Sequence, residues 1–201
     1  MFANALRVGA VTLLVAGASP AITIFTDGFE SNASGSNLVP SGWTVSLGTV
    51  DVLAEGVSFD CHTGARCVDL DGTSSNAGRL ESATEYTFTS GVTYTLTFWL
   101  SRNQRGFGGP DNMTACLGTE CVNFVNLPAS VRSENTWAMY TIVLAGTDSQ
   151  GRISFDHGGG DNVGLILDDV RLADSTVPEP GTFALLGTAL ACVGLYRRRD
   201  S

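Results

Sequence analysis

The segment that most constrains the fold is residues 92–100, VTYTLTFWL, in which apolar and polar side chains alternate. Five apolar side chains would share one face of an extended segment, and three threonines would lie on the other face. Strict alternation of this kind predicts a β-strand with one buried face. Weaker alternation recurs at residues 44–53, 67–71, 122–127, 137–144, 152–155 and 163–172.

Breaks rich in Gly, Ser, Asn and Asp separate these segments, at residues 31–36, 72–78, 106–112 and 158–162. No stretch between residues 22 and 176 keeps apolar side chains at helical spacing for three turns. Many short strands with regular breaks are typical of an antiparallel β-sandwich. We therefore expect an all-β domain over residues 22–176, folded as a β-sandwich or jelly roll.

The charge of the chain excludes one large class of function. The 201 residues carry 20 acidic and 11 basic side chains, and every basic residue is arginine. Residues 22–176 alone hold 18 acids and 7 arginines, a net charge of −11. Nucleic-acid binding requires a basic surface, so we predict no nucleic-acid partner. An acidic surface favours a neutral partner or a divalent cation.

The N-terminal segment, residues 1–21, predicts a secretory signal peptide. Arg7 precedes an apolar run over residues 8–18, and small residues follow up to Ala21. This three-part order is that of a signal peptide cleaved after Ala21, or alternatively after Ala18. A buried N-terminal helix is the alternative interpretation. We expect the chain to leave the cytosol.

The C-terminal segment predicts a single transmembrane helix. Sixteen uncharged residues, 181–196, precede the arginine cluster 197–199. A helix of that length spans about 24 Å, which is marginal for a hydrocarbon core of about 30 Å. The arginines would stay in the cytoplasm, so the domain would lie on the far side of the membrane.

The same segment also carries a family resemblance. Pro178, Glu179 and Pro180, the apolar run, and Arg197, Arg198 and Arg199 occur in that order. Residues 177–201 resemble the PEP-CTERM sorting signal of Gram-negative bacteria that make exopolysaccharide. The resemblance implies an exosortase-type processing protease as partner, and release from the inner membrane to the cell surface or extracellular matrix. A plain tail anchor is the alternative.

Four cysteines form two closely spaced pairs, Cys61 with Cys67 and Cys116 with Cys121. In an oxidising compartment such pairs predict local disulfides that hold turns in place. A four-thiolate zinc site is the alternative, although the spacings are not the usual ones. A fifth cysteine, Cys192, lies in the apolar C-terminal run.

Residues 22–176 also resemble, in order, the galactose-binding-like jelly rolls of bacterial surface proteins and carbohydrate-binding modules. The matching pieces are residues 27–30, 42–43, 67–73, 91–103, Trp137 and 167–170. The resemblance implies a structural calcium ion held by Glu30 and Asp168, with Asp27 and Asp169 as neighbours. The alternative is a carboxylate that accepts hydrogen bonds from backbone donors.

The alternation of residues 163–172 distinguishes the two adjacent aspartates. Asp168 shares its parity with Ile166, Val170 and Leu172, so it is predicted to face the core, where an unpaired carboxylate is unfavourable. Asp169 is predicted to face outward.

A saccharide site requires an apolar ring flanked by polar groups. Trp99 interrupts the threonine face of its strand, and Arg102 and Asn103 begin a polar loop just after it. These three residues are therefore the candidate ligand-binding set. Core packing of the tryptophan and a solvated loop are the alternatives.

Catalysis is poorly supported by the sequence. The two histidines, His62 and His157, do not lie in a nucleophile or metal-ligand motif. We therefore expect an exported, non-enzymatic surface or extracellular-matrix protein that associates with exopolysaccharide. A carbohydrate-binding module with a defined glycan site is the alternative, and a secreted polysaccharide hydrolase is the third hypothesis.

Overall fold

The computed structural model describes residues 21–56 and 58–176, which form thirteen strands and one 3-10 helix. In chain order the elements are β1 (Ile22–Asp27), β2 (Trp43–Leu47), β3 (Asp51–Ala54), β4 (Arg66–Asp69), β5 (Arg79–Ser82), β6 (Tyr86–Phe88), β7 (Val92–Ser101), β8 (Asp111–Leu117), β9 (Glu120–Leu127), η1 (Arg132–Glu134), β10 (Ala138–Ala145), β11 (Ser149–Gly151), β12 (Ile153–Gly158) and β13 (Ile166–Thr176). The predicted signal peptide, except Ala21, and the predicted sorting segment 177–201 lie outside the described residues.

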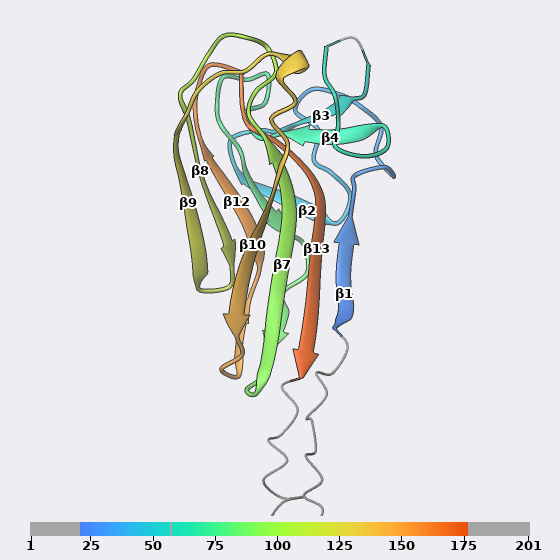
Figure 1. The fold of residues 1–201 in the computed structure, drawn as a ribbon, viewed down its shortest axis with the longest axis vertical. Coiled ribbons are helices and arrows are strands. Elements are labelled where there is room, and N and C mark those ends of the chain that lie inside the picture. Colours follow the sequence, from blue (N-terminus) through green and yellow to red (C-terminus); the bar gives the residue numbers. More distant parts are fainter. Residues whose placement is uncertain (1–20, 57, 177–201) are drawn as a thin grey trace, which may run out of the picture. The chain divides into compact units, whose positions relative to one another are not determined.

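Two antiparallel sheets form the layers of the domain (Figure 1). The first has the order β10-β7-β13-β4-β3, and β1 also pairs with β13. The second has the order β2-β5-β12-β8-β9, and β6 and β11 form a small separate pair. The predicted all-β sandwich is confirmed. Among the described residues, no helix is both long and apolar enough to span a membrane.

The hydrophobic core lies between the two sheets and follows the predicted alternation of β7. Leu96 and Phe98 are fully buried, and Phe98 packs edge-on against Phe155 of β12 at a centroid distance of 5.0 Å. The threonines of β7 lie on the opposite, partly exposed face. Burial of one face of each sheet is what makes the period-two pattern visible in the sequence.

The expected strand at residues 44–53 is wrong, because the chain turns inside it. β2 and β3 belong to different sheets, and Gly48 between them has a φ of +57°. A Cβ at Gly48 would lie 2.0 Å from the carbonyl oxygen of Ala77, so only glycine fits. A second difference is β8, which begins at Asp111 inside the segment expected to be a break.

β13 contains a bulge that changes the predicted orientation of Asp168. Asp168 pairs with Trp99, whereas Arg171 pairs with Thr97, and Asp169 between them has a φ of +47°. The extra residue shifts the alternation by one position. Val170 and Leu172 therefore face the core as predicted, but Asp168 lies on the other face, beside Trp99. It is nevertheless fully buried, because a loop covers it.

Both predicted disulfides are present. Cys61 and Cys67 close a loop before β4, with their Cα atoms 5.4 Å apart. Cys116 and Cys121 join the paired strands β8 and β9 close to their turn. With all four thiols paired, the zinc alternative is excluded.

Candidate functional site

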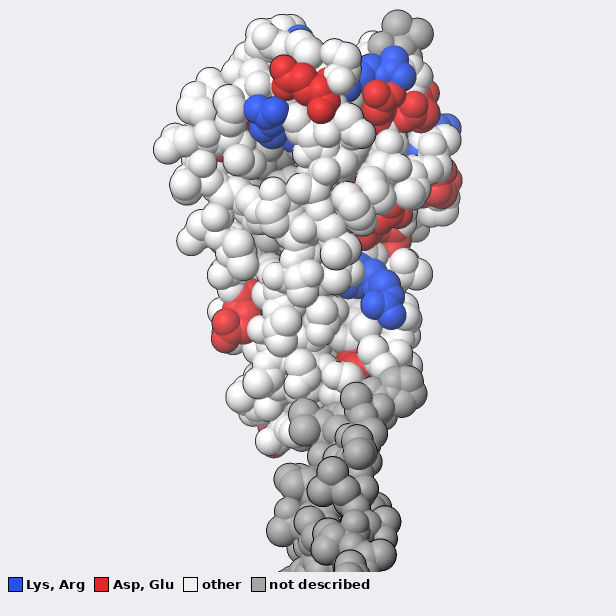
Figure 2. Space-filling model, viewed as in Figure 1, with Lys and Arg blue, Asp and Glu red and all other residues white. Residues whose placement is uncertain are grey.

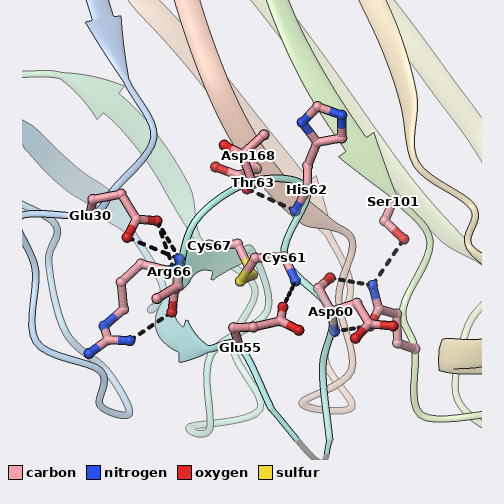
Figure 3. Close-up of a disulfide and its surroundings, with 12 residues drawn as sticks. Glu30, Glu55, Asp60, Cys61, His62, Thr63, Arg66, Cys67, Ser101 and Asp168 are labelled. Carbon is pink, nitrogen blue, oxygen red and sulfur yellow. Dashed lines mark hydrogen bonds between the residues drawn. A yellow bond between two sulfur atoms is a disulfide. The ribbon is translucent and has the colours of Figure 1, made fainter.

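The loop of residues 61–67, called here the amide loop, is held by carboxylates from distant parts of the chain (Figure 3). The backbone N–H groups of His62 and Thr63 donate to Asp168 Oδ2, at 2.9 and 3.1 Å. Those of Ala65 and Arg66 donate to Glu30 Oε1, both at 2.9 Å. The amide loop thus joins the segment after β1 to the last strand.

The two adjacent aspartates of β13 differ in burial and in hydrogen-bond partners. Asp168 is fully buried, and burial raises its pKa to about 7, although the amide hydrogens of Thr63 and His62 oppose this rise. The Asp169 side chain is 29% exposed, contacts His62 Nδ1 at 2.6 Å and accepts a hydrogen bond from Thr63 Oγ1. Asp169 is thus partly exposed.

The fourth predicted calcium ligand, Asp27, has other contacts. Its Oδ1 accepts the N–H of Phe29 and its Oδ2 accepts the indole N–H of Trp43, both at 2.7 Å. Within the described part of the chain, no group of three His, Cys, Asp or Glu side chains is arranged to hold a metal ion. Calcium needs six to eight oxygen ligands, whereas the amide loop presents hydrogens to Glu30 and Asp168. These acids do not fit a calcium site as they are arranged, and calcium binding stays a prediction.

The three predicted ligand-binding residues do not share one surface. Trp99 is half-buried on the outer face of β7, where the His62 ring stacks on it at a centroid distance of 3.7 Å. Arg102 is paired with Glu134 at 3.1 Å. Asn103 is fully buried and donates to Asp111 Oδ2, so its proposed contact with a ligand is wrong. The reason is that the chain turns inward directly after β7.

The outer face of β7 and β10 carries few charges. In the view of Figure 2, charged side chains gather near the loops beside β3 and β4, and the surface over β7 and β10 is largely uncharged. Met139 of β10 lies directly opposite Trp99 and is 56% exposed. This face is therefore a flat mixture of threonine, methionine and tryptophan.

A groove of about 360 Å³ lies on the second sheet, over β8, β9 and β12. Its polar lining includes Asn112 and Thr114 of β8, Asn123 of β9 and Asp156 of β12. Thr114 Oγ1 donates to Asn123 Oδ1 at 2.8 Å, and Asp156 is 3.5 Å from the Arg79 guanidinium. Val125, which is 65% exposed, adds an apolar contact.

The alternation in the sequence did not predict this groove. Its lining comes from three strands, and one of them was expected to be partly a break. Two features of the sequence could have indicated it. Asn112 and Thr114 alternate with buried residues and so face outward, and Asn123 and Val125 do the same in the next strand. Only the pairing of β8 with both β9 and β12 shows that these side chains meet.

Three buried acids and one buried histidine form a second group, called here the buried acid cluster: Asp69, Asp71, Asp111 and His157. Asp69 is paired with Arg105 at 2.7 Å, yet burial raises its pKa to about 7. Burial also raises the pKa of Asp111 to about 6 and lowers that of His157 to about 4. His157 is therefore neutral at pH 7, and its Nε2 accepts the N–H of Leu165 at 3.2 Å.

The C-terminal segment of the chain matches a known sorting motif. Residues 176–199 match the model of the PEP-CTERM protein-sorting motif. The chain carries a PEP-CTERM sorting motif. The motif begins at the last residue of β13, directly after the sandwich, and indicates an exported protein sorted to the cell surface. The residues of the motif beyond Thr176, including Pro178, Glu179, Pro180 and Arg197–Arg199, lie outside the described structure. No curated protein sequence matches this sorted chain.

Several solved structures are similar to this chain. The K3 cleaved adhesin domain of Lys-gingipain from Porphyromonas gingivalis is 18% identical, with a TM-score of 0.51 over 77% of this chain and 99% of that domain. The K2 domain of Lys-gingipain is 19% identical, with a TM-score of 0.49, 74% of this chain and 96% of that one being covered. The carbohydrate-binding module TmCBM61, solved with β-1,4-galactotriose, is 22% identical, with a TM-score of 0.48 and coverages of 72% and 92%. The likeness to the K3 domain shows a shared β-sandwich fold.

Proposed function

We propose that this chain is an exported, non-catalytic surface or extracellular-matrix protein whose sandwich binds neutral carbohydrate in the exopolysaccharide around the cell. The sorting motif supports the location. The groove over β8, β9 and β12 is the observation that carries the binding function. The role of an exosortase as processing partner belongs to the same proposal.

The groove offers the chemistry that sugar hydroxyls need. Asn112 and Asn123 supply amide donors and acceptors, Thr114 supplies a hydroxyl, and Asp156 supplies acceptor oxygens. Val125 provides an apolar surface for a sugar C–H face. Because these groups stand on paired strands, their spacing is fixed before a ligand arrives, which lowers the entropic cost of binding.

The charge of the domain supports a neutral ligand. Eighteen acids against seven arginines over residues 22–176 would repel an anionic polymer. Arg79 is already paired with Asp156 of the groove lining. A neutral glycan meets no such repulsion.

The positions of the histidines support a non-catalytic role. His157 is among the residues that line the groove, but it is 4% exposed and its Nε2 accepts a backbone N–H, so that nitrogen is not available to a substrate. His62 is stacked on Trp99 and paired with Asp169. The secreted-hydrolase hypothesis would have to rest on a pair of carboxylates.

A glycan array followed by calorimetric titration of the exported protein tests the proposal. We expect saturable binding to neutral glycans and at least a tenfold weaker affinity, about 1.4 kcal/mol, for Asn123→Ala and for Thr114→Val. Thr141→Val is the matched control, because Thr141 is exposed on β10 in the other sheet.

Binding that survives both groove variants but is lost in Trp99→Ala would move the site to the opposite sheet. No binding to any neutral glycan would leave a structural role only. Release of sugar fragments during the titration would restore the hydrolase hypothesis.

A further inference from the structure

The amide loop is unusual in how many of its backbone donors point at carboxylates. The N–H groups of residues 62 and 63 donate to Asp168, and those of residues 65 and 66 donate to Glu30. The N–H of Cys61 donates to Glu55 Oε2 at 2.5 Å. Five amides of one short loop therefore bind three acids, which follow β1, follow β3 or lie on β13.

These contacts connect the two ends of the domain. Glu30 comes three residues after β1, and Asp168 lies in β13, the strand with which β1 pairs. Glu30 and Asp168 are the same two acids that the resemblance to calcium-binding jelly rolls implied as metal ligands. Here the amide loop lies between them and contacts both (Figure 3).

The loop supplies the kind of positive charge that a cation would supply. Each amide hydrogen carries a partial positive charge, and a carboxylate that accepts two or three such bonds is stabilised in its ionised form. A calcium ion in the same place would need oxygen ligands, and the loop would present its hydrogens toward that ion. The two arrangements therefore exclude each other.

The disulfide holds the amides in this orientation. Cys67 is fully buried at the start of β4, and its bond to Cys61 returns the chain across the two acids. Gly64 at the turn has a φ of +64°, and a Cβ there would lie 2.3 Å from Glu30 Oε1. The close approach of Glu30 to the loop thus depends on glycine at this position.

We propose that the disulfide-closed amide loop replaces calcium as the structural link between Glu30 and Asp168. The stability of this end of the sandwich then depends on the Cys61–Cys67 disulfide and not on calcium. A second consequence concerns Trp99. The loop also holds His62 on that ring, so opening the disulfide uncovers Trp99. The proposal is independent of glycan binding.

Thermal melts of the exported protein test the proposal. The two variants to compare are Cys61→Ser with Cys67→Ser, and Cys116→Ser with Cys121→Ser. The cysteines are 6 and 5 residues apart in sequence, so loss of loop-closure entropy affects both variants almost equally. Any further loss in the first variant reports the contacts of the amide loop.

We expect the first variant to melt about 5 °C below the second, and to show greater quenching of tryptophan fluorescence by acrylamide. We also expect EDTA and added calcium chloride to leave the wild-type melt unchanged. Equal melts for the two variants would overturn the proposal, as would a fall in melting temperature with EDTA that calcium chloride restores.

If the first variant does not fold, Glu30→Gln supplies the same test, with Glu134→Gln as its control on the exposed helix η1. We expect Glu30→Gln to melt below wild type, and the difference in melting temperature to be the same in EDTA and in calcium chloride. A melting temperature of Glu30→Gln that falls below that of wild type only in the presence of calcium would overturn the proposal.

Discussion

The amide loop and the buried acid cluster both remove carboxylates from water, but they partner them differently. At the amide loop, Asp168 is fully buried and both of its oxygens accept hydrogen bonds. In the buried acid cluster, Asp71 Oδ1 and His157 Nδ1 have no hydrogen-bond partner among the described residues. The hydrogen bonds of Asp168 at the amide loop are thus satisfied, whereas those of Asp71 and His157 in the buried acid cluster are not.

The difference shows what hydrogen-bond satisfaction does for a buried acid. A carboxylate surrounded by donors can anchor a loop, because removing it leaves those donors unpaired. Such donors do not cancel the effect of burial on the pKa, which is raised to about 7 for Asp168 and to about 6 for Asp111, so stability around both acids depends on pH. The buried acid cluster is closely packed, since a Cβ on Gly159 would lie 2.6 Å from Asp71 Oδ2 and 2.8 Å from His157 Cε1.

The largest expected effect is at the amide loop. Asp168→Ala leaves the N–H groups of His62, Thr63 and Asp169 without acceptors in a buried place. We expect a loss of about 3–5 kcal/mol in the free energy of unfolding, measured by urea denaturation. Asp169→Ala is the control, with a loss of about 1 kcal/mol, because its carboxylate is partly exposed. Equal losses would contradict the comparison.

A smaller effect of opposite sign is expected in the buried acid cluster. The pKa of Asp111 is raised to about 6 in the folded state, from 3.8, so its stabilising protonated form is lost as the pH rises through this window. Asp111→Asn cannot ionise. We expect the variant to be about 1–2 kcal/mol more stable than wild type at pH 7, and this advantage to be absent at pH 4. A variant less stable than wild type at pH 7 would show that the charged form is stabilised.

The smallest expected effect is the contribution of His157 to the pH dependence of stability, measured apart from that of Asp111. The pKa of His157 falls to about 4 on folding, from 6.5, so it favours the folded state above pH 6.5 and loses that contribution as the pH falls. In the Asp111→Asn background, we expect His157→Gln to reduce the loss of stability between pH 7 and pH 5 by about 1 kcal/mol. Melts at the two pH values measure this, and an unchanged loss would contradict the neutral, buried state of His157.

The sequence predicted the fold more fully than the site. Alternation in β7 predicted its buried face, and the short spacing of Cys61 and Cys67 predicted their disulfide; the structure confirms both. The expected strand at residues 44–53 failed at Gly48, because a single glycine with positive φ sends the chain to the other sheet. Nothing in the local pattern distinguished that turn from a strand position.

The candidate site depended on contacts that the sequence does not contain. Asn103 lies in a polar segment that is typical of an exposed loop. It is nevertheless buried, and its side-chain amide donates a hydrogen bond to Asp111. The groove on the second sheet requires β8 to lie between β9 and β12. Pairing of strands that are distant in the chain brought these side chains together.

By itself, the sequence determined the strand periodicity, the local disulfides and the sorting motif, because each is a property of a few neighbouring residues. Only the tertiary structure decided the surroundings of Asp168. A bulge at Asp169 turned that carboxylate to the outer face, and a loop more than a hundred residues earlier in the chain covered it with amide hydrogens. Such an arrangement follows from strand register and loop docking, and neither is encoded within a single segment.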